Sequence, residues 1–276
     1  MTDLDNASPH SLPDSGDATG TGPDGNTPPK STPSVIRDVV GFFVMLLVMQ
    51  MAAGVVIGFY AGFTAVASGK ADQSTGFEFG PYELQSVALL SFVFVGLWIW
   101  RVIRQQRHKL TASRFLQPVP SMFDLVFFVI IGTVATLCLQ VGINLFLTEV
   151  LGLNAVEDTN PLRNLPEGGL TTLFVALMVL NVVILAPVFE ELLFRGLIFH
   201  RLQDKYSPTT AMIISAALFA LIHFDLKVFP ALFTLGFIAA YAVHRTGSIM
   251  PAIGMHLLNN MIAISLTLVA AGAPET

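Results

Sequence analysis

Seven long apolar segments follow one another along this chain of 276 residues, and they constrain its fold more than any other feature. About 20 apolar residues cross the hydrocarbon core of a bilayer as a helix. That length selects residues 36–67, 82–101, 121–150, 170–202, 208–224, 229–245 and 249–272. Only 12% of the residues are charged, against about 25% in soluble domains. We therefore expect an all-α fold, a polytopic transmembrane bundle of about seven helices.

The N-terminal segment differs from the rest of the chain. Residues 1–34 are rich in Ser, Thr, Gly, Pro and Asp and nearly free of large apolar side chains, a composition typical of disorder. We predict a disordered cytoplasmic tail there and one transmembrane helical domain over residues 35–273. The single cysteine, Cys138, excludes a disulfide within the chain and lies in an apolar run, where a packing role is expected.

Positive charge predicts the orientation in the membrane, because cytoplasmic connections carry an excess of Lys and Arg. The second connection holds Arg101, Arg104, Arg107, Lys109 and Arg114. With that connection and the N-terminus inside, eleven of the 14 Lys and Arg are cytoplasmic, and the exceptions are Lys70, Arg163 and Lys227. Seven crossings would then place the C-terminus outside. The fifth and sixth segments are short enough to pack as a compact hairpin.

Two adjacent glutamates, Glu190 and Glu191, lie inside the fourth apolar segment. An ionised side chain at the bilayer centre costs about 2.5–3.5 kcal/mol on insertion scales, and neighbouring carboxylates repel each other. Arg195 is one helical turn from Glu191 and can neutralise it, which leaves Glu190 on another face without a partner. Pro187 should kink the helix and free a carbonyl just before Glu190, so we expect water to reach that carboxylate.

Two later segments each carry a histidine in helical register with a second side chain. Phe219 and His223 are four residues apart, as are His256 and Asn260. A lone histidine on an apolar helix is more often a packing residue than a catalyst, yet imidazole titrates near neutral pH. His256 and Asn260 can both donate hydrogen bonds from one face, as groups that stabilise an oxyanion must. Asn259 points elsewhere.

Together these side chains favour acid–base hydrolysis with water as the nucleophile. The sequence contains no Gly-x-Ser-x-Gly and no His-Glu-x-x-His, the patterns of serine hydrolases and zinc proteases. No cofactor is expected and no metal needs to be invoked, although two His and two Glu leave a zinc site as an open alternative.

Three patterns in order resemble a known family. Glu190-Glu191-x-x-x-Arg195, Phe219-x-x-x-His223 and His256-x-x-x-Asn260 resemble the motifs of the CAAX-protease and bacteriocin-processing (CPBP) family of intramembrane glutamic endopeptidases. The Phe-Arg-Gly that follows the glutamates also matches. The resemblance covers about 170–265, the motif-bearing core, and not the first four-tenths of the chain.

The resemblance implies an all-helical membrane fold with a water-accessible site. It implies that Glu190 is the general base that activates water, aided by His223. His256 and Asn260 would bind the tetrahedral oxyanion, while Glu191, Arg195 and Phe219 would support the site. Simple alternation of the segments puts Glu190 near the inner face and His223 near the outer end of a short helix, so the site requires helices that tilt, break or begin deep.

We therefore expect a membrane-embedded endopeptidase in a bacterial inner (plasma) membrane. Its predicted partners are the lipid bilayer and a membrane-associated peptide or protein substrate, and no nucleic acid. A proteolytically silent scaffold or bacteriocin-immunity-type protein stays open. A proton-coupled transporter also stays open, because intramembrane Glu and His form proton relays. The clustering of polar residues late in the chain, without an inverted-repeat counterpart, argues against transport.

Overall fold

The computed structural model describes residues 32–67, 80–105, 121–150, 152 and 171–272, and every regular element within them is helical. This confirms the predicted all-α fold. The predicted tail, residues 1–34, lies outside the described residues except at its end, where the first helix begins at Thr32.

The described residues form seven continuous helices, which confirms the predicted number. They are α1 (Thr32–Ala67), α2 (Pro81–Gln105), α3 (Met122–Glu149), the helix Thr172–Gln203, α7 (Pro208–Leu221), α8 (Phe229–Thr246) and α9 (Met250–Gly272). The helix Thr172–Gln203, termed here the 172–203 helix, changes its winding along its length. It consists of α4 (Thr172–Met178), the π-helix η1 (Val179–Leu185), α5 (Ala186–Glu191), the π-helix η2 (Leu192–Phe199) and α6 (His200–Gln203).

Five of these helices are long and apolar enough to cross a membrane, and each keeps large apolar side chains exposed on its outer face. The five stretches are Val35–Thr64, Pro81–Val102, Met122–Glu149, Thr172–Gln203 and Met250–Val269. Exposed apolar side chains on a row of such helices are suited to contact with lipid. The chain is an integral membrane protein. Seven crossings are not found among the described residues, because α7 and α8 are not among the five.

The hairpin formed by α7 and α8 explains the shortfall. The two helices pack closely against each other, as predicted for the fifth and sixth segments. With 14 residues, α7 is roughly 21 Å long, against about 30 Å of hydrocarbon. A helix of that length that begins at one surface of the hydrocarbon ends within it, so the tip of the hairpin at residues 222–228 is expected at depth.

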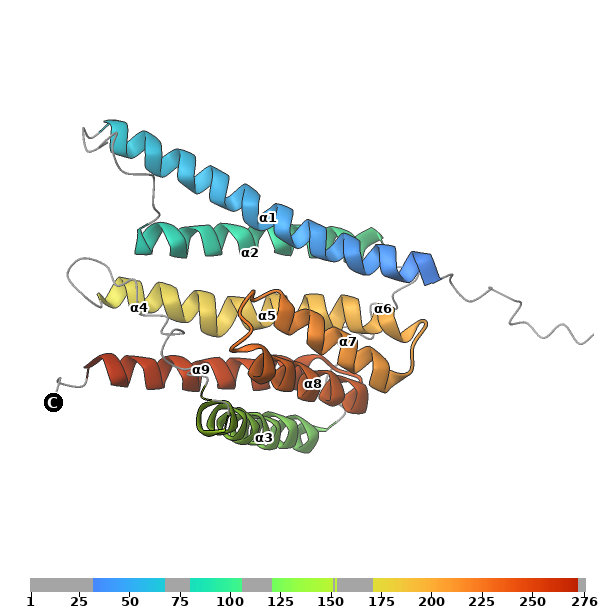
Figure 1. Cartoon of the computed structure of the whole chain (residues 1–276). Coiled ribbons are helices and arrows are strands. Elements are labelled where there is room, and N and C mark those ends of the chain that lie inside the picture. Colours follow the sequence, from blue (N-terminus) through green and yellow to red (C-terminus); the bar gives the residue numbers. More distant parts are fainter. Residues whose placement is uncertain (1–31, 68–79, 106–120, 151, 153–170, 273–276) are drawn as a thin grey trace, which may run out of the picture.

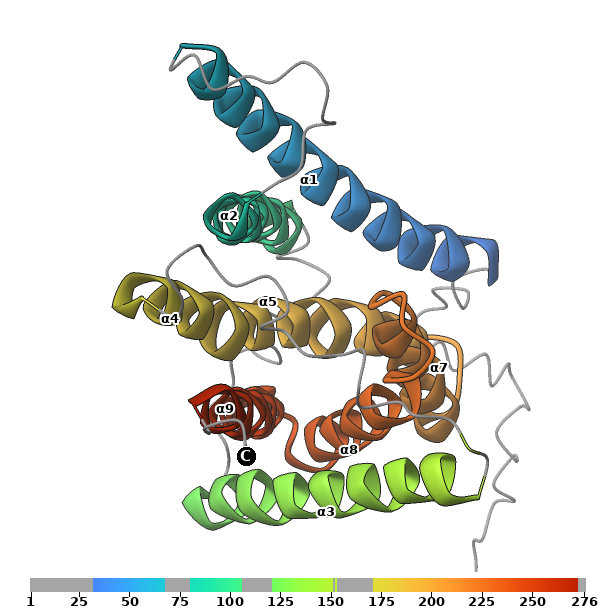
Figure 2. The ribbon, with the colours of Figure 1, turned by 60° about the vertical axis from the view of Figure 1, so that its left-hand side comes forward.

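The 172–203 helix is the centre of the bundle. In Figures 1 and 2 it lies between the pair α1–α2 on one side and the helices α8, α9 and α3 on the other. Helix α2 contacts α4, η1 and α5, whereas α1 contacts η2 and α6. Helix α3 crosses α9, because Figure 1 shows α3 nearly end-on while α9 lies along the picture. Residues on the central helix can therefore meet side chains from both halves of the chain.

Local sequence signals set several helix ends. The Ser121 side chain accepts a hydrogen bond from the Phe123 N–H, the Thr171 side chain from Phe174, and the Ser207 side chain from Thr210. Such N-caps satisfy backbone donors that have no partner within the helix. Helix α8 ends at Gly247, whose φ of 70° is left-handed, a conformation that glycine adopts without strain.

Small residues allow α3 and α9 to cross closely. A Cβ atom on Gly132 of α3 would lie 2.7 Å from the Sδ atom of Met255 on α9, and one on Gly254 would lie 2.6 Å from Val129. The Thr133 hydroxyl reaches the Met255 carbonyl at 3.5 Å. Close approach at small residues is the usual basis of helix packing in membranes, and here it holds α9 against the rest of the bundle.

We predict that Gly132→Leu destabilises the fold by about 1–3 kcal/mol, because the added side chain overpacks the α3–α9 crossing. Gly142→Leu is the matched control on the same helix, since nothing lies within 4 Å of a Cβ atom built there. Thermal unfolding in detergent measures both. Equal unfolding temperatures for the two variants would contradict the close crossing.

Candidate active site

Glu190 and Glu191 differ in their surroundings, as the sequence predicts for neighbours on one helix. The Glu191 side chain is fully buried, whereas the Glu190 side chain keeps 22% of its surface exposed. Glu191 faces α9 and the interior of the bundle, and Glu190 lines a cavity between the 172–203 helix and the pair α1–α2. Glu191 is thus placed for contacts within the bundle, whereas Glu190 is placed for contact with a molecule in the cavity.

The predicted pair of Glu191 and Arg195 forms within the core. An Nη of Arg195 donates to Oε1 of Glu191 at 2.9 Å, and both side chains are wholly inaccessible to solvent. The guanidinium also lies over the ring of Phe219 on α7, 4.6 Å from its centroid, which adds a cation–π attraction. Arg195 therefore neutralises Glu191 and joins the 172–203 helix to α7.

His256 of α9 contacts both glutamates. Its Nδ1 lies 3.0 Å from Oε1 of Glu191, and its Nε2 lies 3.9 Å from Oε2 of Glu190. A carboxylate only accepts hydrogen bonds, so Nδ1 donates to Glu191 and fixes the ring with Nε2 toward Glu190. The prediction from sequence did not include this link from His256 to the Glu191–Arg195 pair.

His223 lies just beyond the last residue of α7, at the tip of the α7–α8 hairpin. Its Nδ1 lies 2.9 Å from the Phe219 carbonyl, which can only accept, so Nδ1 carries the hydrogen and Nε2 is free to take a proton. The Phe219 ring contacts His223 and His256 edge-on, at centroid distances of 5.2 and 5.6 Å. Through this ring His223 is linked to His256, whose Nε2 lies near Glu190.

The depth of the hairpin explains how His223 reaches Glu190. Both residues are roughly 20 Å along a helix from the shared connection at residues 204–207, because each helical residue adds about 1.5 Å. The short α7 therefore returns His223 to the level of Glu190. The sequence analysis expected helices that tilt, break or begin deep, whereas α7 is instead short and ends at residue 221.

Asn260 of α9 forms a hydrogen bond with a backbone carbonyl of the 172–203 helix that has no donor within that helix. Its Nδ2 donates to the Val182 carbonyl at 2.9 Å. In the π-helix η1 the Ala186 N–H donates to Asn181, five residues earlier, and in that register Pro187 should donate to Val182 but has no N–H. Pro187 thus leaves a carbonyl free, as predicted, and Asn260 satisfies it. The neighbouring Asn259 is buried.

The cavity beside Glu190 has a volume of about 50 Å³ and draws its lining from both halves of the chain. Its polar side chains are Gln50 of α1, Ser91 of α2 and Glu190. About 10–15 Å³ suffices for one water molecule, so the cavity has room for water against the carboxylate. Sequence reasoning missed Gln50 and Ser91, and the one available signal was an amide in an otherwise apolar stretch of α1.

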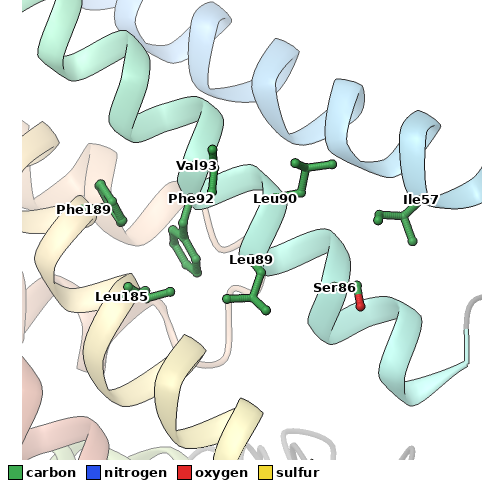
Figure 3. A pocket seen from close by; sticks show the side chains of 8 residues that line it. All are labelled: Ile57, Ser86, Leu89, Leu90, Phe92, Val93, Leu185 and Phe189. Carbon is green, nitrogen blue, oxygen red and sulfur yellow. The ribbon is translucent and has the colours of Figure 1, made fainter.

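A larger apolar cavity of about 420 Å³ adjoins this one between α1, α2 and α5 (Figure 3). Ile57, Leu89, Leu90 and Leu185 are among its lining residues. The stacked rings of Phe92 and Phe189, 5.6 Å apart and 11° from parallel, line both cavities. The two cavities therefore share a wall at the Phe92–Phe189 stack.

Metal ligation was an open alternative from the sequence. Within the described part of the chain, no group of three or more His, Cys, Asp or Glu side chains is arranged to hold a metal ion. The nitrogen and oxygen atoms of His256 and the two glutamates instead contact one another and Arg195.

Fold and site together define a polytopic membrane protein with a buried carboxylate–imidazole cluster. Residues 172–262 match the family model described as type II CAAX prenyl endopeptidase Rce1-like. Over 94 residues the chain is 34% identical to the "Putative membrane peptidase YdiL" of Bacillus subtilis (strain 168). The aligned residues make up 34% of this chain and 38% of that relative. No solved structure matches the chain.

The resemblance inferred from the three motifs is confirmed over residues 172–262, the part of the chain that is similar to the Rce1-like family. The matched region contains every site residue predicted from the sequence. It does not include α1 and α2, which supply Gln50 and Ser91 to the cavity.

We predict that Arg195→Met destabilises the protein by about 3–5 kcal/mol, because it leaves the Glu191 carboxylate buried without its cation. The double variant Glu191→Gln, Arg195→Met removes both charges and should recover part of that loss. Unfolding in detergent, followed by loss of helical circular dichroism, gives the three free energies. A double variant no more stable than Arg195→Met would contradict the charge-pairing role.

Proposed function

We propose that this protein is a membrane-embedded endopeptidase that hydrolyses a peptide bond with a water molecule activated by Glu190 and His223. The observation that carries the proposal is the water-sized cavity against the half-buried Glu190 carboxylate, whose Oε2 lies 3.9 Å from Nε2 of His256. A carboxylate that is accessible to water, lies beside an imidazole and has no Arg or Lys paired with it among the described residues is suited to general-base catalysis.

In the proposed first step, Glu190 removes a proton from water, and the resulting hydroxide attacks the carbonyl carbon of the scissile bond. The free Nε2 of His223 orients the same water. In the second step the protonated Glu190 gives its proton to the leaving nitrogen as the C–N bond breaks. Glu190 thus acts as base and then as acid, and the cycle ends with the carboxylate restored.

The tetrahedral intermediate carries a negative oxygen that needs hydrogen-bond donors. We assign this task to Nε2 of His256, when it is protonated, and to the second N–H of the Asn260 amide. The Phe219 ring packs edge-on against both His256 and His223 and so restrains them. The Arg195 guanidinium packs over the same ring.

The proposed substrate is a peptide or protein segment associated with the membrane, since the cavities lie between membrane-spanning helices. The name of the Bacillus subtilis relative supports a membrane peptidase.

We predict that Glu190→Gln lowers kcat by about 10²–10⁴-fold, the usual contribution of a general base. Glu149→Gln, an exposed carboxylate at the end of α3, is the matched control and should cleave as the wild type does. The measurement uses purified protein in liposomes and a library of membrane-tethered peptides, with cleavage read by mass spectrometry.

The same assay tests the histidine. His223→Ala should lose activity by a similar factor, whereas His244→Ala, at an exposed position near the end of α8, should retain it. Cleavage by Glu190→Gln at the wild-type rate would refute the mechanism. A folded wild type that cuts no peptide in the library would favour the silent-scaffold alternative. Proton flux into liposomes that Glu190→Gln abolishes would favour transport.

We also propose a bacterial inner membrane location with the N-terminus in the cytoplasm. The beginning of α1, the end of α2 and α6 lie at one end of the bundle (Figure 1). Arg201 of α6 pairs there with Asp38 of α1. Arg101 and Arg104 at the end of α2 add positive charge to that end, which is the pattern of a cytoplasmic face.

Cysteine labelling tests this orientation in a Cys138→Ser background. We expect Lys205→Cys, at the α6–α7 connection, to react with an impermeant maleimide in inverted vesicles only. Thr172→Cys, at the opposite end of the 172–203 helix, should react in intact spheroplasts. The reverse pattern would show that the N-terminus lies outside.

A further inference from the structure

Gln50 is a primary amide in the middle of the apolar stretch of α1. The stretch Val35–Thr64 is long and apolar enough to cross the membrane, so the side chain lies where hydrogen-bonding groups without partners are costly. Among the described residues, no hydrogen-bond partner of Gln50 is present; the residue is exposed, and it lines the cavity that Glu190 also lines. An amide in this setting is suited to hydrogen bonding with a molecule that enters the cavity.

We infer that Gln50 is a substrate-positioning residue that binds the peptide backbone of the substrate beside the scissile bond. The inference rests on the proposed function and extends it to α1, a helix outside the region matched by the family model. It assigns to the first half of the chain a direct part in substrate binding.

The position of Gln50 supports this role. Leu46 and Gln50 are one helical turn apart on the same face of α1, and both line the Glu190 cavity. Across the cavity lie Phe189 and Glu190. A peptide whose carbonyl carbon faces a water held by Glu190 therefore passes between the 172–203 helix and α1, within reach of the amide.

The chemistry of the amide fits a peptide backbone better than the other groups of the cavity wall do. A backbone segment that is unwound for cleavage presents both N–H donors and C=O acceptors, and in lipid each needs a partner. The Gln50 side chain offers two N–H donors and one acceptor oxygen. Ser91 on the same wall already donates its hydroxyl hydrogen to the Val87 carbonyl at 2.8 Å, so it has acceptor capacity only.

The test compares Gln50→Leu with Gln140→Leu, using a library peptide that the wild type cleaves. Gln140 is a glutamine in the membrane-spanning helix α3, which packs on α8 and α9 and does not line the cavity. We expect Gln50→Leu to raise KM about three- to tenfold, the effect of one or two lost hydrogen bonds, with kcat nearly unchanged because binding to ground and transition states is lost equally. Gln140→Leu should match the wild type.

A substrate series identifies the contact. Each backbone amide flanking the scissile bond is replaced in turn by an ester, which removes one N–H donor. At one position the ester should raise KM for the wild type but not for Gln50→Leu, because the partner is already absent. Gln50→Met, of similar length, serves as a second variant if Gln50→Leu does not fold.

The outcomes separate the two proposals. If Gln50→Leu and Gln50→Met keep the wild-type KM while Glu190→Gln is inactive, the inference about Gln50 is overturned and the proposed function stands. If Gln50→Leu lowers kcat and the unfolding temperature together, with no ester position coupled to it, Gln50 is a structural residue and the inference is overturned. Cleavage that does not depend on Glu190 overturns both.

Discussion

The site depends on one fully buried ion pair, Glu191 with Arg195. A buried carboxylate without a cation is strongly unfavourable, and a paired one still requires further hydrogen bonds and contacts. Those contacts come from His256 and Phe219, so the pair determines the position of α9 and α7 relative to the 172–203 helix. The positioning of the imidazoles is therefore a consequence of neutralising one acid, and the adjacent acid is left to face the cavity.

Helix α7 is shorter than the hydrocarbon core of a bilayer is thick, and this difference shapes the site. A helix that is too short to cross carries Phe219 in its last turn and His223 just beyond its end, beside the cluster. In a soluble protein such a tip would be solvated by bulk water. In lipid it is tolerable because backbone groups at the tip bond locally, as the His223 N–H does to the Ala220 carbonyl, and because irregular backbone at depth can line a polar cavity.

Much of this arrangement could be predicted from the sequence. Long apolar segments locate helices to within a few residues, since segment length is fixed by the bilayer. Four-residue spacing correctly placed Glu191 beside Arg195 and Phe219 beside His223. The contacts between helices could not be predicted, because crossing and rotation depend on packing at residues such as Gly132 and Met255. For that reason the bond from His256 to Glu191 and the role of Gln50 in the cavity wall emerged only from the structure.

The bond between Asn260 and Val182 has a consequence for biosynthesis. Pro187 leaves the Val182 carbonyl without a donor inside its own helix, and the donor comes from α9, which is synthesised after that helix. Until α9 inserts, that carbonyl has to be hydrated or bound by some temporary neighbour. Completion of the backbone hydrogen bonding beside Glu190 thus coincides with the arrival of α9, so a chain synthesised only as far as α8 lacks this bond.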